Sequence, residues 1–381
     1  MLNIIYAGTP DVAVPPLDYL ANSDKVRVVG VLTREDAPVG RKRVLTPSPV
    51  AQRAEELGLP VVKANRWNDE AAAAIAELNA DAAAVVAYGA LLPLSALESL
   101  RYGWVNLHFS KLPAWRGAAP VQRALIAGEQ EIFSTTFLLE EGLDTGPTFE
   151  QESTPVTADD TAGSVLMRLA ISGGALLERT FERLEAGENG TVQVEDESVS
   201  YASKMSIADG RLTWTEPAEQ ILARFRGVTP EPGAWCELGE NRFKIGGLAV
   251  ADERLVQSLI EANGGPLAPG AVRLHAKKVL VGTGTEPLML LQVQPAGKKM
   301  MDAPAWARGA GKDMAEGLVV LARATKSAPT REDTASPVTL VTPATASSAR
   351  VAVRVSSIRA VARVKAVRSV SVAVAPARVL V

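Results

Sequence analysis

Short runs of apolar and β-branched residues alternate with helix-like segments through the first half of the chain. The runs typical of buried strands are 3–8, 25–33, 60–64, 81–89 and 104–108. Between them, apolar residues recur at helical spacing up to about residue 22 and over 50–59 and 69–80. Such an alternation predicts an α/β domain with a mostly parallel sheet and helices on both faces.

The pattern changes in the second half. Residues 132–156 predict two strands joined by a Gly-Pro turn, and residues 159–187 predict one long helix. Beyond residue 217, short strands with turn signals every 8–12 residues indicate a small β-barrel. The predicted organisation is an α/β domain over 1–200, a linker over 201–217 and a barrel domain over 218–315.

Composition separates the C-terminal segment 325–381 from the rest. From Thr334 onward it holds seven Lys or Arg residues and no acidic residue, and Ala, Val, Ser and Thr supply most of the remainder. Because the whole chain has a formal net charge of −3, residues 1–333 carry about −10. We predict a disordered low-complexity tail, with a basic arm that binds nucleic acid as the alternative.

Several classes of protein are excluded by composition. One cysteine, Cys236, rules out an internal disulfide framework and is typical of a reducing compartment. Two histidines, His108 and His275, are too few and too scattered for a structural zinc site. No apolar run is long enough to cross a bilayer, and the N-terminus lacks a signal-peptide pattern. We therefore expect a cytoplasmic protein without a metal or a membrane association.

Polar residues gather where the last parallel strand is predicted to end. Asn106 and His108 lie two residues apart, so on a strand they point to the same side of the sheet. Asp144 lies in the glycine-flanked stretch "GLDTGP". An amide and an imidazole suit a developing oxyanion, and a nearby carboxylate can orient the ring or take a proton. The trio fits attack by a substrate's own nucleophile on a carbonyl; the alternative is a strand cap and a turn.

Two stretches carry a specific resemblance, "NLHFSKLPAWRGAAPVQRAL" and "GLDTGP". They resemble the signatures of folate-dependent formyltransferases, Asn-x-His-x-Ser-Leu-Leu-Pro-x-x-Arg-Gly followed by Asp-Thr-Gly. Further stretches, among them "IIYAGTPDVAVPPL", "YASKMS" and "VQPAGKKMM", are most similar to the members that act on methionyl-tRNA. The resemblance covers about 1–315 and implies a Rossmann-like catalytic domain followed by an OB-like barrel that binds tRNA.

The resemblance also implies a reaction and its residues. The donor would be 10-formyltetrahydrofolate, and the acceptor would be the α-amino group of methionine on initiator Met-tRNA, with a monomeric enzyme and no metal. The implied catalytic residues are Asn106, His108 and Asp144. The residues implied to bind folate are Tyr88, Gly89, Ser110, Lys111, Leu112 and Pro113.

One position departs from the family pattern. Lys111 stands where these enzymes have leucine. We expect its long stem to let the cation reach solvent at the edge of the pocket, and impaired folate binding is the alternative.

A basic loop is predicted after the second strand. Residues 33–50 contain prolines and a glycine, show no helix or strand pattern and hold Arg41, Lys42 and Arg43 at their tip. The resemblance implies that this loop wedges against the tRNA acceptor end, and a solvated surface loop is the bland alternative.

Three rival functions remain to be weighed. Formyltransferases that act on a ribonucleotide or an amino sugar share the catalytic domain, but the barrel argues against the ribonucleotide enzyme. A dinucleotide-dependent hydride-transfer enzyme would need Gly-x-Gly-x-x-Gly after the first strand, where this chain has one glycine and then prolines. A non-catalytic tRNA-binding protein has no need of all three polar residues.

Overall fold

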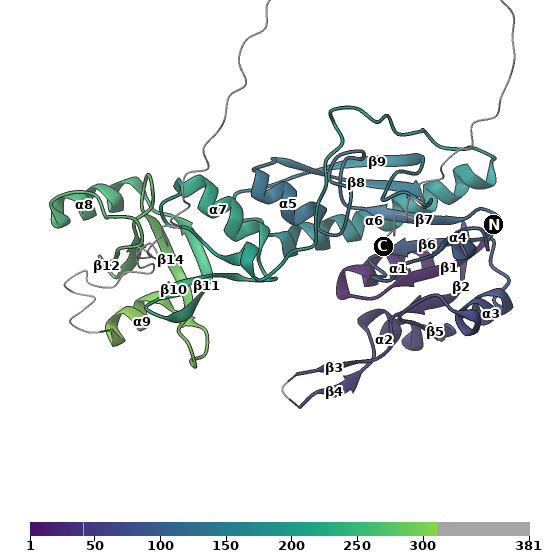
Figure 1. Ribbon diagram of the computed structural model, residues 1–381, viewed down its shortest axis with the longest axis horizontal. Helices are drawn as coiled ribbons and strands as arrows, with labels where there is room; N and C mark the ends of the chain where they lie inside the picture. The colour runs from purple at the N-terminus through teal and green to yellow at the C-terminus, as the bar shows by residue number, and fades with distance from the viewer. Residues whose placement is uncertain (41, 311–381) are drawn as a thin grey trace, which may run out of the picture. The chain divides into compact units, whose positions relative to one another are not determined.

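The computed structural model describes residues 1–40 and 42–310 of the chain. Its first sheet has seven strands (Figure 1). In spatial order they are β5 (Val61–Lys63), β2 (Val26–Thr33), β1 (Leu2–Gly8), β6 (Ala82–Val86), β7 (Trp104–His108), β8 (Glu131–Leu138) and β9 (Thr148–Pro155). Pairing is parallel from β5 to β7 and antiparallel from β7 to β9. This confirms the predicted α/β class with a mostly parallel sheet.

Both faces of this sheet are buried, because apolar side chains of the central strands alternate between two cores. In β1, Ile4 and Tyr6 belong to one core, and Ile5 to the other. The helices that supply the first core are α1 (Val14–Ala21), α2 (Pro49–Glu56), α5 (Pro120–Ala127) and α6 (Ala162–Glu185). Those that supply the second are α3 (Asp69–Glu77) and α4 (Leu94–Leu97). Burial on both faces explains why these strands read as nearly continuous apolar runs.

Local residues set the start of helix α6 and its close packing on β7. Thr161 caps its first turn, and Ser164 returns a hydrogen bond to the Thr161 backbone, which forms a capping box. Its Gly173 lies against β7, and a Cβ added there would stand 2.3 Å from Leu107 Cδ2. The close approach lets a long helix pack on the strand that carries the predicted catalytic residues.

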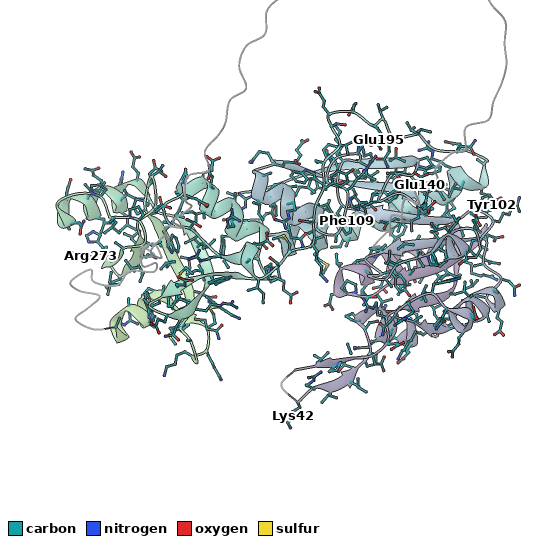
Figure 2. The ribbon with its side chains drawn as sticks, viewed as in Figure 1. Lys42, Tyr102, Phe109, Glu140, Glu195 and Arg273 are labelled. Carbon is teal, nitrogen blue, oxygen red and sulfur yellow. The ribbon has the colours of Figure 1, made fainter. Side chains whose placement is uncertain are left out.

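The loop predicted without regular structure forms a β-hairpin, so that part of the sequence interpretation was wrong. Strands β3 (Ala37–Val39) and β4 (Val44–Thr46) pair with each other, with Val39 opposite Val44. The prolines hid the signal, since Pro38 lies within a strand that pairs with no third strand. Lys42 lies at the tip (Figure 2), and Arg41 lies outside the described residues.

The remaining described elements form a second sheet with its own core. Its strands are β10 (Ala234–Leu238), β11 (Asn241–Val250), β12 (Val272–His275), β13 (Lys278–Val281), β14 (Leu288–Gln294) and β15 (Met301–Asp302). Its helices are α7 (Ala218–Gly227), α8 (Glu253–Asn263) and α9 (Ala303–Gly309). All pairings are antiparallel, and β11 bends at a register shift beside Gly247. Closure of this sheet into an OB-like barrel stays a prediction.

Residues of the predicted linker contribute to the core of the second sheet. Leu212 and Trp214 are buried in it. They follow the 3-10 helix η2 (Ala208–Gly210). The predicted domain bounds stay a prediction. The tail over 325–381 lies outside the described residues. Through residue 310, with Arg41 left out, no helix has the length and apolar character needed to span a bilayer.

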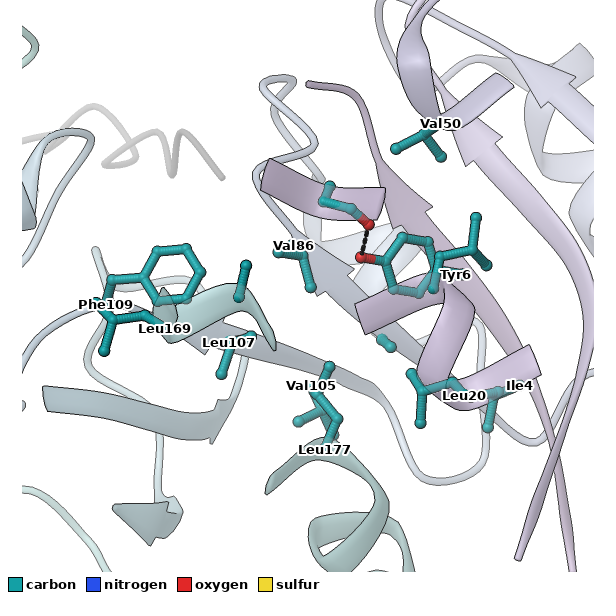
Figure 3. Close-up of a cluster of buried hydrophobic side chains, with 14 of the residues drawn as sticks. Ile4, Tyr6, Leu20, Val50, Val86, Val105, Leu107, Phe109, Leu169 and Leu177 are labelled. Carbon is teal, nitrogen blue, oxygen red and sulfur yellow. Dashed lines mark hydrogen bonds between the residues drawn. The ribbon is translucent and has the colours of Figure 1, made fainter. Parts of the chain in front are cut away.

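A buried hydrogen bond in the first core gives a test of this packing (Figure 3). The hydroxyl of Tyr6, fully buried, donates to the carbonyl of Ala13 in the 3-10 helix η1 (Asp11–Ala13) at 2.5 Å. Removing it with Tyr6→Phe should lower the free energy of unfolding by about 1 kcal/mol, measured by chemical denaturation. Tyr19→Phe is the control, because the Tyr19 hydroxyl bonds Glu178 in an exposed pair. Equal losses for the two variants would contradict the prediction.

Candidate active site

A cavity of about 420 Å³ lies at the carboxyl edge of the first sheet. Its lining comes from the residues that follow β2 and β6, from the end of β7 and the loop after it, from the turn between β8 and β9, and from Lys204. The polar residues of the lining are Arg34, Asn106, His108, Asp144 and Lys204. Open α/β sheets bind their ligands in this kind of position, beyond the carboxyl ends of the strands.

Asn106 and His108 enter the cavity from the same face of β7. The strand is buried along its length, and each of the two side chains is 6% exposed. Among the residues that the structure describes, no hydrogen bond occupies the Asn106 side-chain amide. A buried amide without a protein partner is available to a bound molecule.

The ring of His108 is held by a backbone carbonyl. Its Nε2 lies 3.0 Å from the carbonyl oxygen of Trp115, and the ring packs edge-on against Phe137. Because a carbonyl only accepts, this bond places a proton on Nε2. The second ring nitrogen, Nδ1, lies 3.8 Å from Asp144 Oδ2, which is too far for a hydrogen bond. Trp115, rather than Asp144, therefore orients the imidazole.

Asp144 is a buried carboxylate in a tight turn. It is 2% exposed, and its backbone is left-handed with φ +53°, a conformation that aspartate adopts more readily than most residues. Its Oδ2 accepts a hydrogen bond from the Gly117 N–H at 2.6 Å. The same oxygen faces His108 Nδ1 at 3.8 Å.

Two cationic residues of the lining were missed by the sequence interpretation. Arg34 follows β2, and its guanidinium donates to the Gly89 carbonyl at 2.7 Å and to Asn65 Oδ1 at 2.8 Å, which ties three strand-end loops together. Lys204 belongs to the quoted stretch "YASKMS", to which no role was given. The position of Arg34 after a parallel strand was a signal that could have found it.

The two predicted folate-binding residues after β6 have different surroundings. Gly89 lines the cavity. Tyr88 is 1% exposed and turns away, since its hydroxyl donates to the Ala64 carbonyl at 2.8 Å. Burial raises the pKa of Tyr88 to about 12. Tyr88 thus supports the loop from within the core that α3 and α4 share with the first sheet.

The predicted folate-binding residues after β7 do not line the cavity. Ser110 is buried, and its hydroxyl donates to the carbonyl four residues later at 2.6 Å. Leu112 is buried and joins Pro113 through a cis peptide bond. Lys111 is exposed, with its ammonium 4.9 Å from the centre of the Phe133 ring. The expected position of Lys111 at the edge of a folate pocket stays a prediction, as does folate binding by the segment.

The described cations of the predicted tRNA loop lie on the β3–β4 hairpin. Lys42 and Arg43 occupy its turn, and both are exposed. The exposed apolar residues Val39, Val44 and Leu45 flank them. Over the described residues, no cluster of His, Cys, Asp or Glu has the geometry to hold a metal ion.

Known proteins match both halves of the chain. Residues 2–180 match the model of the formyl transferase family, and residues 204–311 match that of the formyl transferase C-terminal domain. A methionyl-tRNA formyltransferase of Arthrobacter sp. (strain FB24) is 53% identical over 308 residues, covering 81% of this chain and 97% of its own. The chain belongs to the methionyl-tRNA formyltransferase family. A second member, from Paenarthrobacter aurescens (strain TC1), is 52% identical over 81% of this chain and 97% of its own.

Solved formyltransferases share the fold at much lower identity. The N-formyltransferase from Helicobacter canadensis, solved with folinic acid and dTDP-3-aminofucose, superposes with a TM-score of 0.55 at 18% identity. The match covers 77% of this chain and 100% of that one. Membership of the family confirms the predicted enzyme class and decides against the dinucleotide-dependent and non-catalytic alternatives.

The turn that holds Asp144 depends on Gly146. A Cβ added at Gly146 would stand 1.8 Å from the carbonyl oxygen of Leu138, so the backbone of the turn would have to move. We expect Gly146→Ala to lower kcat/KM by about 10²-fold, because a displacement of about 1 Å at a reacting group has that effect. Gly309→Ala is the control, since a Cβ there meets nothing within 4 Å. Steady-state kinetics that matched wild type for Gly146→Ala would refute this view of the turn.

Proposed function

We propose that this chain transfers the formyl group of 10-formyltetrahydrofolate to the α-amino group of methionine on initiator Met-tRNA, giving formylmethionyl-tRNA. The observation that carries the proposal is the convergence of Asn106, His108 and Asp144 on one cavity in a member of this family. No second function is favoured by a separate observation.

The reaction exchanges one C–N bond for another. The neutral amine of methionine attacks the formyl carbon, and collapse of the tetrahedral intermediate breaks the bond to the folate nitrogen. One proton leaves the amine, and one proton reaches the leaving nitrogen. The chain must therefore stabilise an oxyanion and relay one proton.

Asn106 and His108 are the oxyanion donors of this proposal. The Asn106 amide has no protein partner among the described residues and can donate to the oxyanion without rearrangement. The Nε2 proton of His108 is engaged by Trp115, so the ring can donate to the oxyanion only through Nδ1, when it is an imidazolium.

In this scheme Asp144 stabilises the positive charge on His108 and helps to move the proton of the amine. Its carboxylate lies 3.8 Å from His108 Nδ1 and stabilises the imidazolium in a nearly dry site. A water between the two groups can carry the amine proton toward the leaving nitrogen. Because Gly117 holds the same carboxylate oxygen, the carboxylate keeps its direction through the cycle.

Binding of the two substrates is assigned to separate parts of the chain. We place folate beside Gly89 and the segment Ser110–Pro113, and we assign contact with the tRNA acceptor end to Arg41, Lys42 and Arg43. The domain bounds 1–200, 201–217 and 218–315, with tRNA contacts from the last, belong to the same proposal. A cytoplasmic monomer without a membrane association belongs to the same proposal.

The catalytic assignment predicts a loss of turnover without a loss of binding. Single replacement of Asn106, His108 or Asp144 by Ala should lower kcat by about 10²-fold or more, because these groups act on the transition state. The assay is transfer of labelled formyl to Met-tRNA, with tRNA affinity measured separately. His275→Ala is the matched control, since His275 lies on β12 of the second sheet and contacts only Ser258 of α8 through its ring nitrogen among the hydrogen bonds of the described residues. Near-normal turnover in His108→Ala would overturn the mechanism.

The hairpin assignment predicts a change in salt dependence. Replacing Lys42 and Arg43 together by Ala should raise KM for Met-tRNA and lower kcat/KM about ten-fold, and it should flatten the dependence on salt because fewer phosphates are neutralised. Folate affinity should not change. Lys25→Ala is the control, because Lys25 precedes β2 at the opposite edge of the sheet. Parallel salt slopes for the hairpin variant and wild type would return the hairpin to a solvated surface element.

A further inference from the structure

A segment without helix or strand connects α6 to the second sheet and touches both catalytic loops. We name residues 191–204 the strap. Its backbone pairs with the loop after β7, since Arg116 N–H donates to Ser200 O at 2.8 Å and Ala202 N–H donates to Arg116 O at 2.7 Å. Ser200 Oγ also accepts from Trp115 N–H at 2.9 Å. The strap therefore fixes the backbone on either side of the carbonyl that orients His108.

One side chain of the strap reaches the other catalytic loop. The Gln193 amide nitrogen donates to the carbonyl of Asp144 at 2.9 Å and to that of Gly146 at 2.8 Å. Its amide oxygen accepts from Arg116 Nη2 at 2.9 Å. Gln193 thus joins the turn of Asp144 to the loop that holds His108, and the hydrogen bonds of its side chain go to these two loops.

Arg116 makes this link costly to break. It is 1% exposed, and its other terminal nitrogen, Nη1, donates to Glu195 at 2.7 Å. Glu195 lies on the strap (Figure 2), and its side chain is 65% exposed. The Nε of Arg116 has no hydrogen-bond partner among the described residues. A buried guanidinium with so few partners depends on each one, so Gln193 is held in place from both sides.

We propose that Gln193 and Arg116 are positioning residues that set the distance between Asp144 and His108 for formyl transfer. The inference rests on the proposed function. Asp144 lies in the turn between β8 and β9, and the carbonyl that orients His108 belongs to Trp115 in the loop after β7; Asp144 and Trp115 both have left-handed backbone. Neither turn is part of a regular ladder at that residue, so side-chain links must fix their separation.

The test replaces the two donors of Gln193 while keeping its size. Gln193→Glu retains the oxygen that faces Arg116, but its carboxylate cannot donate to the Asp144 and Gly146 carbonyls. We expect kcat to fall between ten- and a hundred-fold, with KM for both substrates within three-fold of wild type. Val192→Ala and Val194→Ala are matched controls, because these strap neighbours are 79% and 65% exposed.

A double-mutant cycle separates positioning from a general structural role. In the Asp144→Ala background, Gln193→Glu should lower kcat by less than two-fold, since the group that it positions is gone. A multiplicative loss in that background, or wild-type kcat in the single variant, overturns the inference. If Gln193→Glu fails to fold, Gln193→Ala in the same two backgrounds replaces it, because it adds no charge.

The assay also separates this inference from the function on which it rests. A wild-type chain that forms no formylmethionyl-tRNA refutes both proposals. A wild-type chain that is active, beside strap variants with unchanged kcat, refutes only the positioning role. Thermal unfolding of each variant shows whether a lower kcat results from a lower stability. We expect that it does not.

Discussion

Strand β7 pairs with a parallel neighbour on one side and an antiparallel neighbour on the other, and the site depends on that position. Parallel pairing with β6 brings the end of β7 to the edge where β1 and β2 also end. Antiparallel β8 runs away from that edge and ends with Leu138 opposite Val105, so the turn after β8 doubles back along β7 and brings Asp144 to 3.8 Å from His108 Nδ1. One strand thereby gathers residues that lie far apart in sequence.

Placing polar side chains at the end of a buried strand has an energetic cost that the surroundings offset. Asn106, His108 and Asp144 are each nearly excluded from water, and unpaired polar groups there are unfavourable. His108 and Asp144 each take one backbone partner, the Trp115 carbonyl and the Gly117 N–H. What is left over, namely the Asn106 amide and His108 Nδ1, is the part that a substrate can satisfy.

Those backbone partners belong to irregular chain, which must itself be held. Regular ladder pairing fixes β7 and β8, but Trp115 and Asp144 lie in irregular segments with left-handed backbone. The strap supplies the missing constraint through Gln193, Ser200 and the buried Arg116. The hairpin that carries Lys42 is the opposite case, a short ribbon that pairs only with itself and carries exposed side chains.

The sequence by itself determined the α/β class, the position of β7 and the pairing of Asn106 with His108 on one face, because strand periodicity and spacing are local properties. It also determined the family, through motifs that lie in order along the chain. It missed the β3–β4 hairpin, because Pro38 and two three-residue strands leave no periodicity to detect. Only the tertiary structure decided that Trp115 orients His108, that Arg34 and Lys204 line the cavity, and that Tyr88 and Ser110 turn away from it. These outcomes depend on contacts between segments far apart in sequence, and no local pattern encodes the distance between two turns.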